Sequence, residues 1–322
     1  MEPNRTDTSG GMESLDLSII VVNWNGGDLL CRCLASVYGH TSGLAFEVVV
    51  VDNASGDGSA ERVERDFPQS VVIRNPSNRG FARAANQGIR ACRGERILLL
   101  NSDIEVRDNA IREMALFLDR HPGAGMAGCR LVHEDGSCQK SWGRTRSVVN
   151  ETGERIVQFG LRKRIPLFCR MATRRTRGPR PVDWVSGAFL LTRRSVVERI
   201  GFLDERFFLY FEDIDWCARA REAGWQVIYH PHLQAVHTGG GSVAGTESRE
   251  CLAYRRSQLL FYRKRYGNGA NTRVLRLYLG LVALAGIIRA GTAGRFGPRP
   301  GAGGPADGSN PHRELLRLVL NR

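Results

Sequence analysis

The chain has 322 residues, of which 42% are hydrophobic and 25% charged, and this is the composition of a soluble globular protein with a large core. The formal net charge is +13, and arginine carries nearly all of it because only Lys140, Lys163 and Lys264 are lysines. No RNA- or DNA-binding motif surrounds the basic residues, so nucleic acid is not a predicted partner. The eight cysteines form no C-x-x-C pair, which argues against a zinc site or disulfide framework and is typical of a cytosolic protein.

Residues 1–16 are polar and rich in Gly and Ser, which predicts a disordered leader without the apolar stretch of a signal peptide. Strands and helices then alternate. Apolar runs predict buried strands at 17–22, 46–51, 71–74 and 97–101, and helices are predicted to follow the first three of them. This alternation predicts an α/β fold with a mostly parallel central sheet flanked by helices.

Polar side chains follow three of these strands: Asn25, Asp52 and Asp103. The carboxyl ends of parallel strands meet at one edge of a sheet, where open α/β folds bind their ligands. Asp103 could hold a divalent metal there or cap the next helix, and both interpretations remain open on this residue alone. The first strand is followed by NWNGG, so the glycine fingerprint of dinucleotide-binding folds is absent, as is the Walker motif.

After the fourth strand, the sequence predicts a helix at 109–121, strand character at 182–192 and an acidic segment that follows a run of aromatic residues at 207–211. Asp213 is predicted at the mouth of a helix over 214–223, pointing into the cleft. Asp215 is predicted to pair with Arg219, four residues further along that helix. Two short strands, 226–229 and 234–237, follow.

The tail starts near Thr246 with a basic helix at 249–266 and an apolar segment at 274–288 that has arginines on both sides. This segment is shorter than the roughly 20 residues that span a bilayer, so it predicts either an interfacial helix or a core helix packed on the preceding domain. The basic stretch 162–180 is either a solvated loop or a site for phosphate or anionic lipid.

Six motifs occur in order, namely SIIVVNWNG (18–26), VVDNASGDGS (50–59), NRGFARAANQG (78–88), LLLNSD (98–103), SGAFLLTRR (186–194) and FLDERFFLYFEDIDWCAR (202–219), with His237 after them. Over residues 17–267 the chain thereby resembles the inverting glycosyltransferases of family two, which have the GT-A fold, and in particular the bacterial rhamnosyltransferases of cell-wall and O-antigen assembly. The resemblance implies a GT-A catalytic domain at 17–245, with a nucleotide-binding half (17–123) and an acceptor half (124–245). A helical tail (246–294) and a flexible C-terminus (295–322) are predicted to follow.

The resemblance also implies roles for individual residues. Asp52 would read the nucleotide base, and the rest of the donor site would be formed by Asn25, Asn53, Arg79, Asn86, Asn101, Ser102 and Asp103. Asp103 and His237 would bind Mn²⁺ or Mg²⁺, although Asn101 replaces the first acid of the family's metal motif. Asp213 would be the catalytic base, Glu212 would hold the acceptor or orient Asp213, and Trp184 would be an acceptor platform or an ordinary core aromatic.

The implied activity is metal-dependent transfer of a sugar, with inversion, from a dTDP- or UDP-sugar to a glycan or polyprenyl-linked glycan of the cell envelope. L-rhamnose from dTDP-rhamnose is the expected donor sugar. UDP-galactofuranose, UDP-glucose and UDP-N-acetylglucosamine remain alternatives, as does a nucleotide-sugar-binding protein without turnover. The expected location is the cytoplasm, with peripheral contact to the inner face of the plasma membrane.

Overall fold

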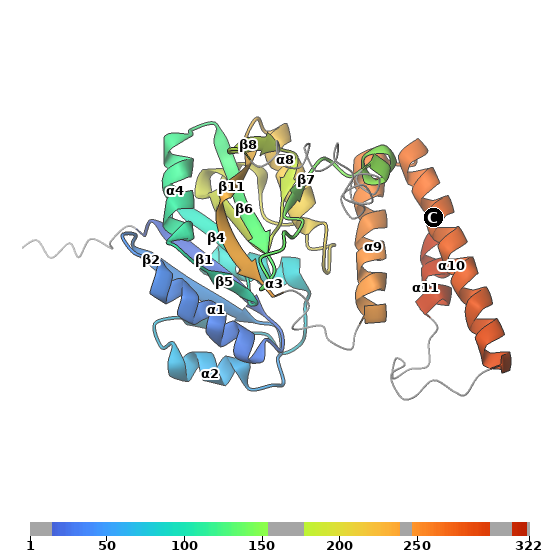
Figure 1. Cartoon of the computed structure of the whole chain (residues 1–322), viewed down its shortest axis with the longest axis horizontal. Coiled ribbons are helices and arrows are strands. Elements are labelled where there is room, and N and C mark those ends of the chain that lie inside the picture. The colour runs from blue at the N-terminus through green and yellow to red at the C-terminus, as the bar shows by residue number, and fades with distance from the viewer. Residues whose placement is uncertain (1–14, 154–176, 239–246, 297–310, 321–322) are drawn as a thin grey trace, which may run out of the picture.

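The computed structural model describes residues 15–153, 177–238, 247–296 and 311–320. Its centre is a nine-stranded sheet in the order β3-β2-β1-β4-β10-β6-β11-β5, with β8 paired to β11 (Figure 1). The strands are β1 (Leu17–Asn23), β2 (Phe46–Asp52), β3 (Val71–Arg74), β4 (Arg96–Asn101), β5 (Ile104–Val106), β6 (Ala124–Val132), β8 (Arg180–Val182), β10 (Phe189–Arg193) and β11 (Gln226–His237). β7 (Trp142–Gly143) and β9 (Trp184–Val185) form a separate ribbon.

The helices are α1 (Gly27–His40), α2 (Ser59–Asp66), α3 (Phe81–Ala91), α4 (Ala110–Arg120), α7 (Arg194–Ile200), α8 (Glu212–Glu222), α9 (Glu247–Tyr266), α10 (Ala270–Phe296) and α11 (Pro311–Leu320). α1 and α4 pack on one face of the sheet, and α3, α7 and α8 pack on the other. Successive residues of β1 enter opposite cores, with Ile19 in one and Ile20 in the other. This alternation explains why the strands are uninterrupted apolar runs.

The predicted parallel sheet is confirmed in the half formed by β3, β2, β1 and β4, which are joined by crossover helices. The other half is mixed. β10 lies antiparallel to both β4 and β6, and β11 is parallel to β6 but antiparallel to β5 and β8. Because β10 runs against β4, the segment that precedes β10 meets the carboxyl end of β4.

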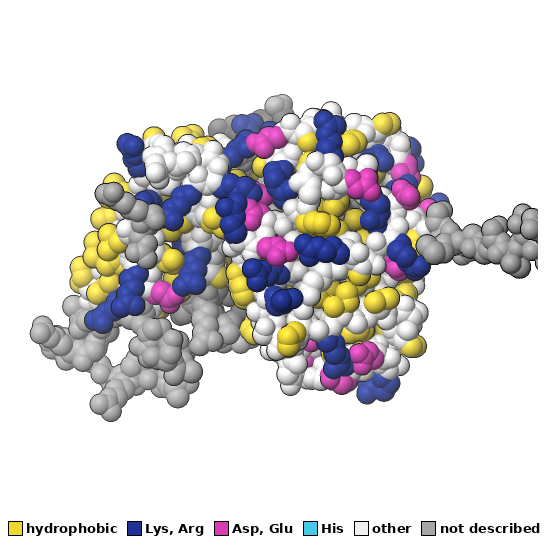
Figure 2. Space-filling model, turned by 180° about the vertical axis from the view of Figure 1, so that it is seen from behind, with side chains coloured by type: hydrophobic (Ala, Val, Ile, Leu, Met, Phe, Trp, Pro, Cys, Tyr) yellow, Lys and Arg dark blue, Asp and Glu magenta, His cyan; other side chains and the backbone are white. Residues whose placement is uncertain are grey.

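The tail helices α9, α10 and α11 pack on the side of the sheet that carries α3 and α8 (Figure 1). One side of α10 is buried through Leu275, Leu279 and Ala283. The other side is apolar but exposed, and we call it the α10 apolar face: Val274, Leu277, Tyr278, Leu281, Leu284 and Ile288. Figure 2 shows a cluster of hydrophobic side chains at the edge of the molecule where α10 lies.

Among the described residues, one helix is long and apolar enough to cross a membrane by length and composition, over Ala270–Ile288, and 22% of that stretch is buried. The prediction of a flexible segment over 295–322 is wrong for its last part, since residues 311–320 form α11. Leu315 and Val319 of α11 are buried against the tail helices, and this contact supplies the partner that a short amphipathic helix needs.

Three predicted segments lie wholly or largely outside the described residues: residues 1–14 of the disordered leader, residues 162–176 of the basic stretch and residues 297–310 of the flexible C-terminus. The described end of the basic stretch is ordered, because Arg180 lies in β8 with its guanidinium 4.0 Å from the centre of the Trp142 ring. The cysteines in the described part of the chain are all free thiols.

Candidate active site

The ends of β2, β1 and β4 bring the predicted site residues to one edge. Asn23 is in register with Asp52 of β2, and its neighbour Val22 is in register with Asn101 of β4. The backbone N–H of Asn101 then donates to Ala188 O at 3.1 Å, which extends this edge to the segment before β10. The edge therefore runs continuously from Asp52 to Ala188, as expected for a ligand site of an open α/β sheet.

Asp52 is buried at this edge and is oriented by its neighbours. Its Oδ1 accepts a hydrogen bond of 2.8 Å from Asn23 Nδ2, and its Oδ2 accepts one of 3.1 Å from the backbone N–H of Ser55. Asn23 is itself fully buried and also donates to Ser59 Oγ. Asn23 is not among the residues predicted from the sequence, although a polar residue at the end of an apolar strand is a usable signal.

Asn53 shapes the loop that leads into α3. Its Nδ2 donates to Asn78 Oδ1 at 2.9 Å, and its Oδ1 accepts from the backbone N–H of Arg79 at 2.9 Å. Asn53 is buried, whereas Arg79 is exposed. Gly80 has φ +83°, and a Cβ there would lie 2.6 Å from Phe208 O, so only glycine allows this close approach.

Asp103 and His237 meet across the sheet, with Asp103 Oδ1 and His237 Nε2 3.2 Å apart. Gln139 Oε1 lies 2.7 Å from His237 Nδ1 and can only accept, so Nδ1 carries a proton. In the neutral imidazole, the Nε2 lone pair then faces Asp103. Ligands of one octahedral cation lie about 3 Å apart, and metal-binding histidines commonly donate their second N–H to a carbonyl oxygen. The Asp103–His237 pair therefore fits a divalent cation. Asn101 Nδ2 lies 3.4 Å from His237 Nε2, and Ser102, the next residue in the chain after Asn101, is buried.

Among the described residues, no group of three or more His, Cys, Asp or Glu side chains could hold a metal by itself. A cation bound by Asp103 and His237 therefore needs oxygen ligands from another molecule or from water. Gln139 is not among the residues predicted from the sequence, because 98 residues separate it from His237.

Asp213 lies in the first turn of α8, next to the same edge. Its Oδ2 accepts from the backbone N–H of Gly187 at 2.9 Å, and its Oδ1 accepts from that of Ile214 at 2.7 Å. Gly187 precedes Ala188, whose carbonyl bonds Asn101, so one short segment connects the Asp213 carboxylate with the end of β4. Burial raises the pKa of Asp213, and the two backbone N–H groups and the charge of Arg146 oppose this rise.

The family model described as "Glycosyl transferase family 2" matches residues 18–201, more than half of the chain. This chain belongs to glycosyl transferase family 2. It is accordingly an enzyme, a glycosyltransferase, and both the predicted family and the predicted class of activity are confirmed.

Among curated proteins, the transferase is 28% identical over 263 residues to the N-acetylglucosaminyl-diphospho-decaprenol L-rhamnosyltransferase of Mycobacterium tuberculosis, covering 78% of this chain and 85% of that protein. It is also 28% identical over 200 residues to the dTDP-rhamnosyl transferase RfbF of Shigella flexneri, covering 60% of each. Its relatives thus include rhamnosyltransferases of cell-wall and O-antigen synthesis.

Among solved structures, the transferase resembles the mannosyltransferase PcManGT of Pyrobaculum calidifontis in complex with GDP-Man and Mn²⁺, with a TM-score of 0.54 and 19% identity over 96% of this chain and 85% of that one. The TM-score against GalNAc-T7 with UDP, GalNAc and Mn²⁺ is 0.55, with 15% identity over 78% of this chain and 48% of that one. These similarities confirm the predicted GT-A fold.

In the transferase, two residues predicted to bind the donor have other contacts. Asn86 is fully buried, and its amide pairs with the backbone N–H and C=O of Leu203 and donates to Glu205 Oε1. It therefore holds the loop before α8. Asn25 is exposed, and its Oδ1 accepts from the backbone N–H of Gly56 at 2.8 Å, which joins the loops after β1 and β2.

Trp184 has the contacts of a core aromatic. It is 5% exposed, its indole N–H donates to Arg144 O at 2.9 Å, and a Cβ on Gly143 would lie 2.8 Å from its ring. The Arg146 guanidinium lies 5.1 Å from the centre of the indole. These contacts leave little of the ring for a sugar to stack on, so the core alternative of the sequence analysis is favoured.

Glu212 is buried beside Asp213, and its Oε2 has no hydrogen-bond partner in the described part of the chain. Burial raises its pKa well above the ordinary value of 4.5, and the negative charge of Asp213 adds to the rise. Because Asp213 accepts two backbone N–H bonds, it is the better site for the negative charge of the pair. We expect Glu212 to keep its proton at neutral pH while Asp213 is ionised.

The elevated pKa of Glu212 predicts a pH dependence of stability. The folded state holds the Glu212 proton more tightly than the unfolded state. The contribution of this proton to the free energy of unfolding is therefore complete below about pH 4.5 and is lost as pH rises through the pKa of Glu212 in the folded state. Glu212→Gln should remove this loss and stabilise the protein by about 1–3 kcal/mol at alkaline pH. Urea unfolding at several pH values measures the free energy of unfolding of both proteins. If its slope against pH were the same in Glu212→Gln as in the wild type, the raised pKa of Glu212 would be contradicted.

Proposed function

We propose that the transferase moves L-rhamnose from dTDP-rhamnose, with inversion, onto a glycan or polyprenyl-linked glycan of the cell envelope. The observation that carries this proposal is the position of Asp213, whose carboxylate is bonded to Gly187 at 2.9 Å beside the donor edge of the sheet. The donor sugar is inferred from relatives, since two of them are named as rhamnosyltransferases.

In the proposed reaction, Asp213 accepts the proton of an acceptor hydroxyl while that oxygen attacks the anomeric carbon. The bond from this carbon to the diphosphate breaks on the opposite face, so the anomeric configuration inverts. The backbone N–H groups of Gly187 and Ile214 orient the carboxylate, and its burial makes it a stronger base than an exposed aspartate. One carboxylate is sufficient because the nucleoside diphosphate is already a good leaving group.

Asp103 and His237 would hold Mn²⁺ or Mg²⁺, and the structural neighbours that contain Mn²⁺ support this choice. The cation would neutralise negative charge on the leaving diphosphate. Gln139 keeps the proton of His237 on Nδ1 and so leaves Nε2 available as a ligand. Asp52 would accept from the ring N–H of the nucleotide base, held in place by Asn23.

A transfer assay tests the proposal. The protein would be incubated with Mn²⁺, a lipid-linked or free glycan acceptor and one donor at a time from dTDP-rhamnose, UDP-galactofuranose, UDP-glucose and UDP-N-acetylglucosamine. We expect a product only with dTDP-rhamnose, with an anomeric configuration opposite to that of the donor. Transfer of another sugar would replace the donor assignment, retention of configuration would contradict the mechanism, and no transfer at all would contradict the function.

We also propose that the enzyme works at the inner face of the plasma membrane, held there by the α10 apolar face. This face is a row of exposed side chains from Val274 to Ile288, and Arg273 is exposed at its start. A helix with this pattern suits the boundary between headgroups and acyl chains. Flotation with anionic liposomes in low salt should recover the protein with the lipid, and Leu277→Asp with Leu281→Asp should abolish that recovery; a soluble wild-type protein would contradict the proposal.

A further inference from the structure

α9 contacts the segment that leads into the catalytic helix. We call residues 202–211 the base loop, because it joins α7 to the turn of α8 that carries Asp213. Ser257 Oγ of α9 donates to Leu209 O of this loop at 2.7 Å. Phe211 is buried, and its ring lies 5.2 Å from that of Tyr254 and 5.6 Å from that of Phe261, both of α9.

The end of the base loop has an unfavourable backbone conformation. Tyr210 and Phe211 have φ values of +68° and +70°, a left-handed conformation that bulky residues rarely adopt. Such a conformation is strained and persists only where surrounding contacts hold it. Side chains of α9 contact Leu209, Tyr210 and Phe211. These three residues come directly before Glu212 and Asp213.

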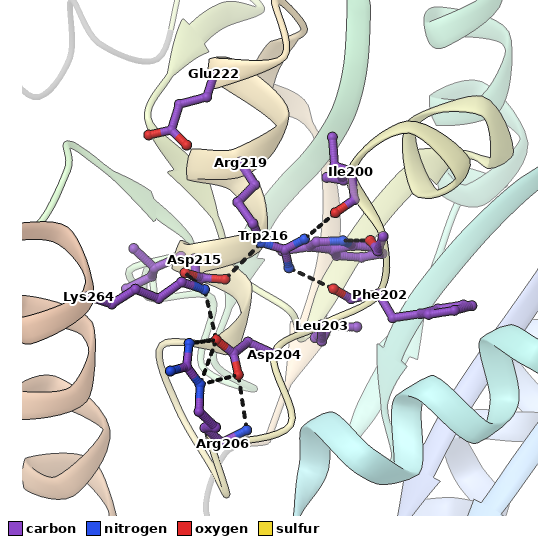
Figure 3. A network of polar contacts seen from close by, with 12 residues as sticks. Ile200, Phe202, Leu203, Asp204, Arg206, Asp215, Trp216, Arg219, Glu222 and Lys264 are labelled. Carbon is purple, nitrogen blue, oxygen red and sulfur yellow. Dashed lines mark hydrogen bonds and ion pairs between the residues drawn. The ribbon is translucent and has the colours of Figure 1, made fainter.

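Lys264 connects α9 to both ends of this region (Figure 3). Its Nζ lies 2.6 Å from Asp215 Oδ1 on α8 and 2.8 Å from Asp204 Oδ2 in the base loop. Both carboxylates are largely buried, at 6% and 14% exposure, so this cation is not easily replaced by water. The pKa of Asp204 is lowered from its ordinary value, chiefly by a hydrogen bond from Arg206 and to a smaller extent by one from Lys264.

The base loop also touches the donor side. Phe208 O accepts from the backbone N–H of Phe81 at 2.7 Å, and Gly80 lies against the same residue. Asn53 Nδ2 donates to Gly80 O at 3.3 Å and so holds the loop around Gly80. A displacement of the base loop would therefore move Asp213 and, through the contacts of Phe208, the backbone at the donor edge.

We propose that α9 is a positioning element for glycosyl transfer, and that Lys264 and Ser257 are its positioning residues. They hold the base loop in its left-handed turn, and this places the Asp213 carboxylate against the acceptor. Lys264 acts through Asp215 and Asp204 and does not touch the substrate. This inference rests on the proposed function, because it assigns Asp213 as the base.

Four variants test it: Lys264→Met, Lys264→Arg, Ser257→Ala and, as a matched control, Arg256→Met. Arg256 lies on the same helix and pairs with Glu314 of α11, away from the base loop. We expect Lys264→Met to lower kcat by about 10- to 100-fold, the effect of a misplaced reacting group. Ser257→Ala, which removes one hydrogen bond, should lower it by about 3- to 10-fold, and donor KM should change by less than about twofold in both.

Lys264→Arg keeps the positive charge between the two carboxylates and should recover kcat to within about fivefold of wild type, while Arg256→Met should match wild type. Hydrogen exchange of the amides of residues 209–215 should be faster in Lys264→Met than in the control. A purely stabilising role for Lys264 would lower Tm but leave kcat of the folded enzyme and these exchange rates unchanged, and that result would overturn the inference.

The two proposals can fail separately. If the wild-type protein transfers no sugar from any donor, the proposed function fails, and the exchange rates still report whether α9 holds the base loop. If the wild type is active and Lys264→Met and Ser257→Ala are equally active, the positioning inference fails while the function stands.

Discussion

Asp213→Asn should lower kcat for sugar transfer by about a thousandfold, because an amide cannot accept the proton of the acceptor hydroxyl. The substitution keeps the size of the side chain, and an amide oxygen can still accept from Gly187. Donor binding should therefore be retained within a few-fold. Steady-state kinetics with the best donor, together with donor binding by calorimetry, measure both quantities.

Asp135→Asn is a matched control for this change. Asp135 is an exposed residue that bonds the backbone N–H of Ser137, and its substitution should leave kcat unchanged. If Asp213→Asn retained full activity while remaining folded, another group would have to be the base. If it lost donor binding as well, Asp213 would act in the donor site and not on the acceptor.

Asp103→Ala should abolish the metal-dependent stabilisation by nucleotide. For the wild type, a nucleotide sugar at ~100 times its dissociation constant should add about 2.7 kcal/mol in the presence of Mn²⁺ or Mg²⁺, and EDTA should remove this gain. Asp103 supplies the carboxylate of the pair with His237, so its loss leaves a single protein ligand. Thermal shift with and without EDTA measures the effect.

Two further variants distinguish a residue that binds the metal from a residue that only orients a metal ligand. His237→Ala should behave like Asp103→Ala, whereas Gln139→Ala should weaken metal binding by about 10- to 100-fold without abolishing it, since Gln139 only orients the imidazole. His40→Ala, at the exposed end of α1, is the control. A nucleotide-induced shift that is the same in EDTA as in Mn²⁺ would contradict the metal assignment.

Much of this protein could be predicted from the sequence because the relevant signals are local. The apolar run 97–100 specifies a strand buried on both faces, and Asp103 follows it wherever that strand is placed. The pair of Asp215 and Arg219, at 2.9 Å, follows from helical periodicity and is confirmed.

Other features were decided only by the tertiary structure, because they join residues that are far apart in the chain. Asn86 bonds Leu203 across 117 residues, and Lys264 reaches Asp204 across 60. A polar side chain carries no local signal of its partner, so Asn86 could be assigned to a ligand from its motif although the fold uses it to hold the base loop. The antiparallel direction of β10, which brings Gly187 to Asp213, depends in the same way on long-range pairing. The sequence by itself determined the strands and which residues end them; only the folded chain determined which side chains meet at the candidate site and which hold those side chains in place.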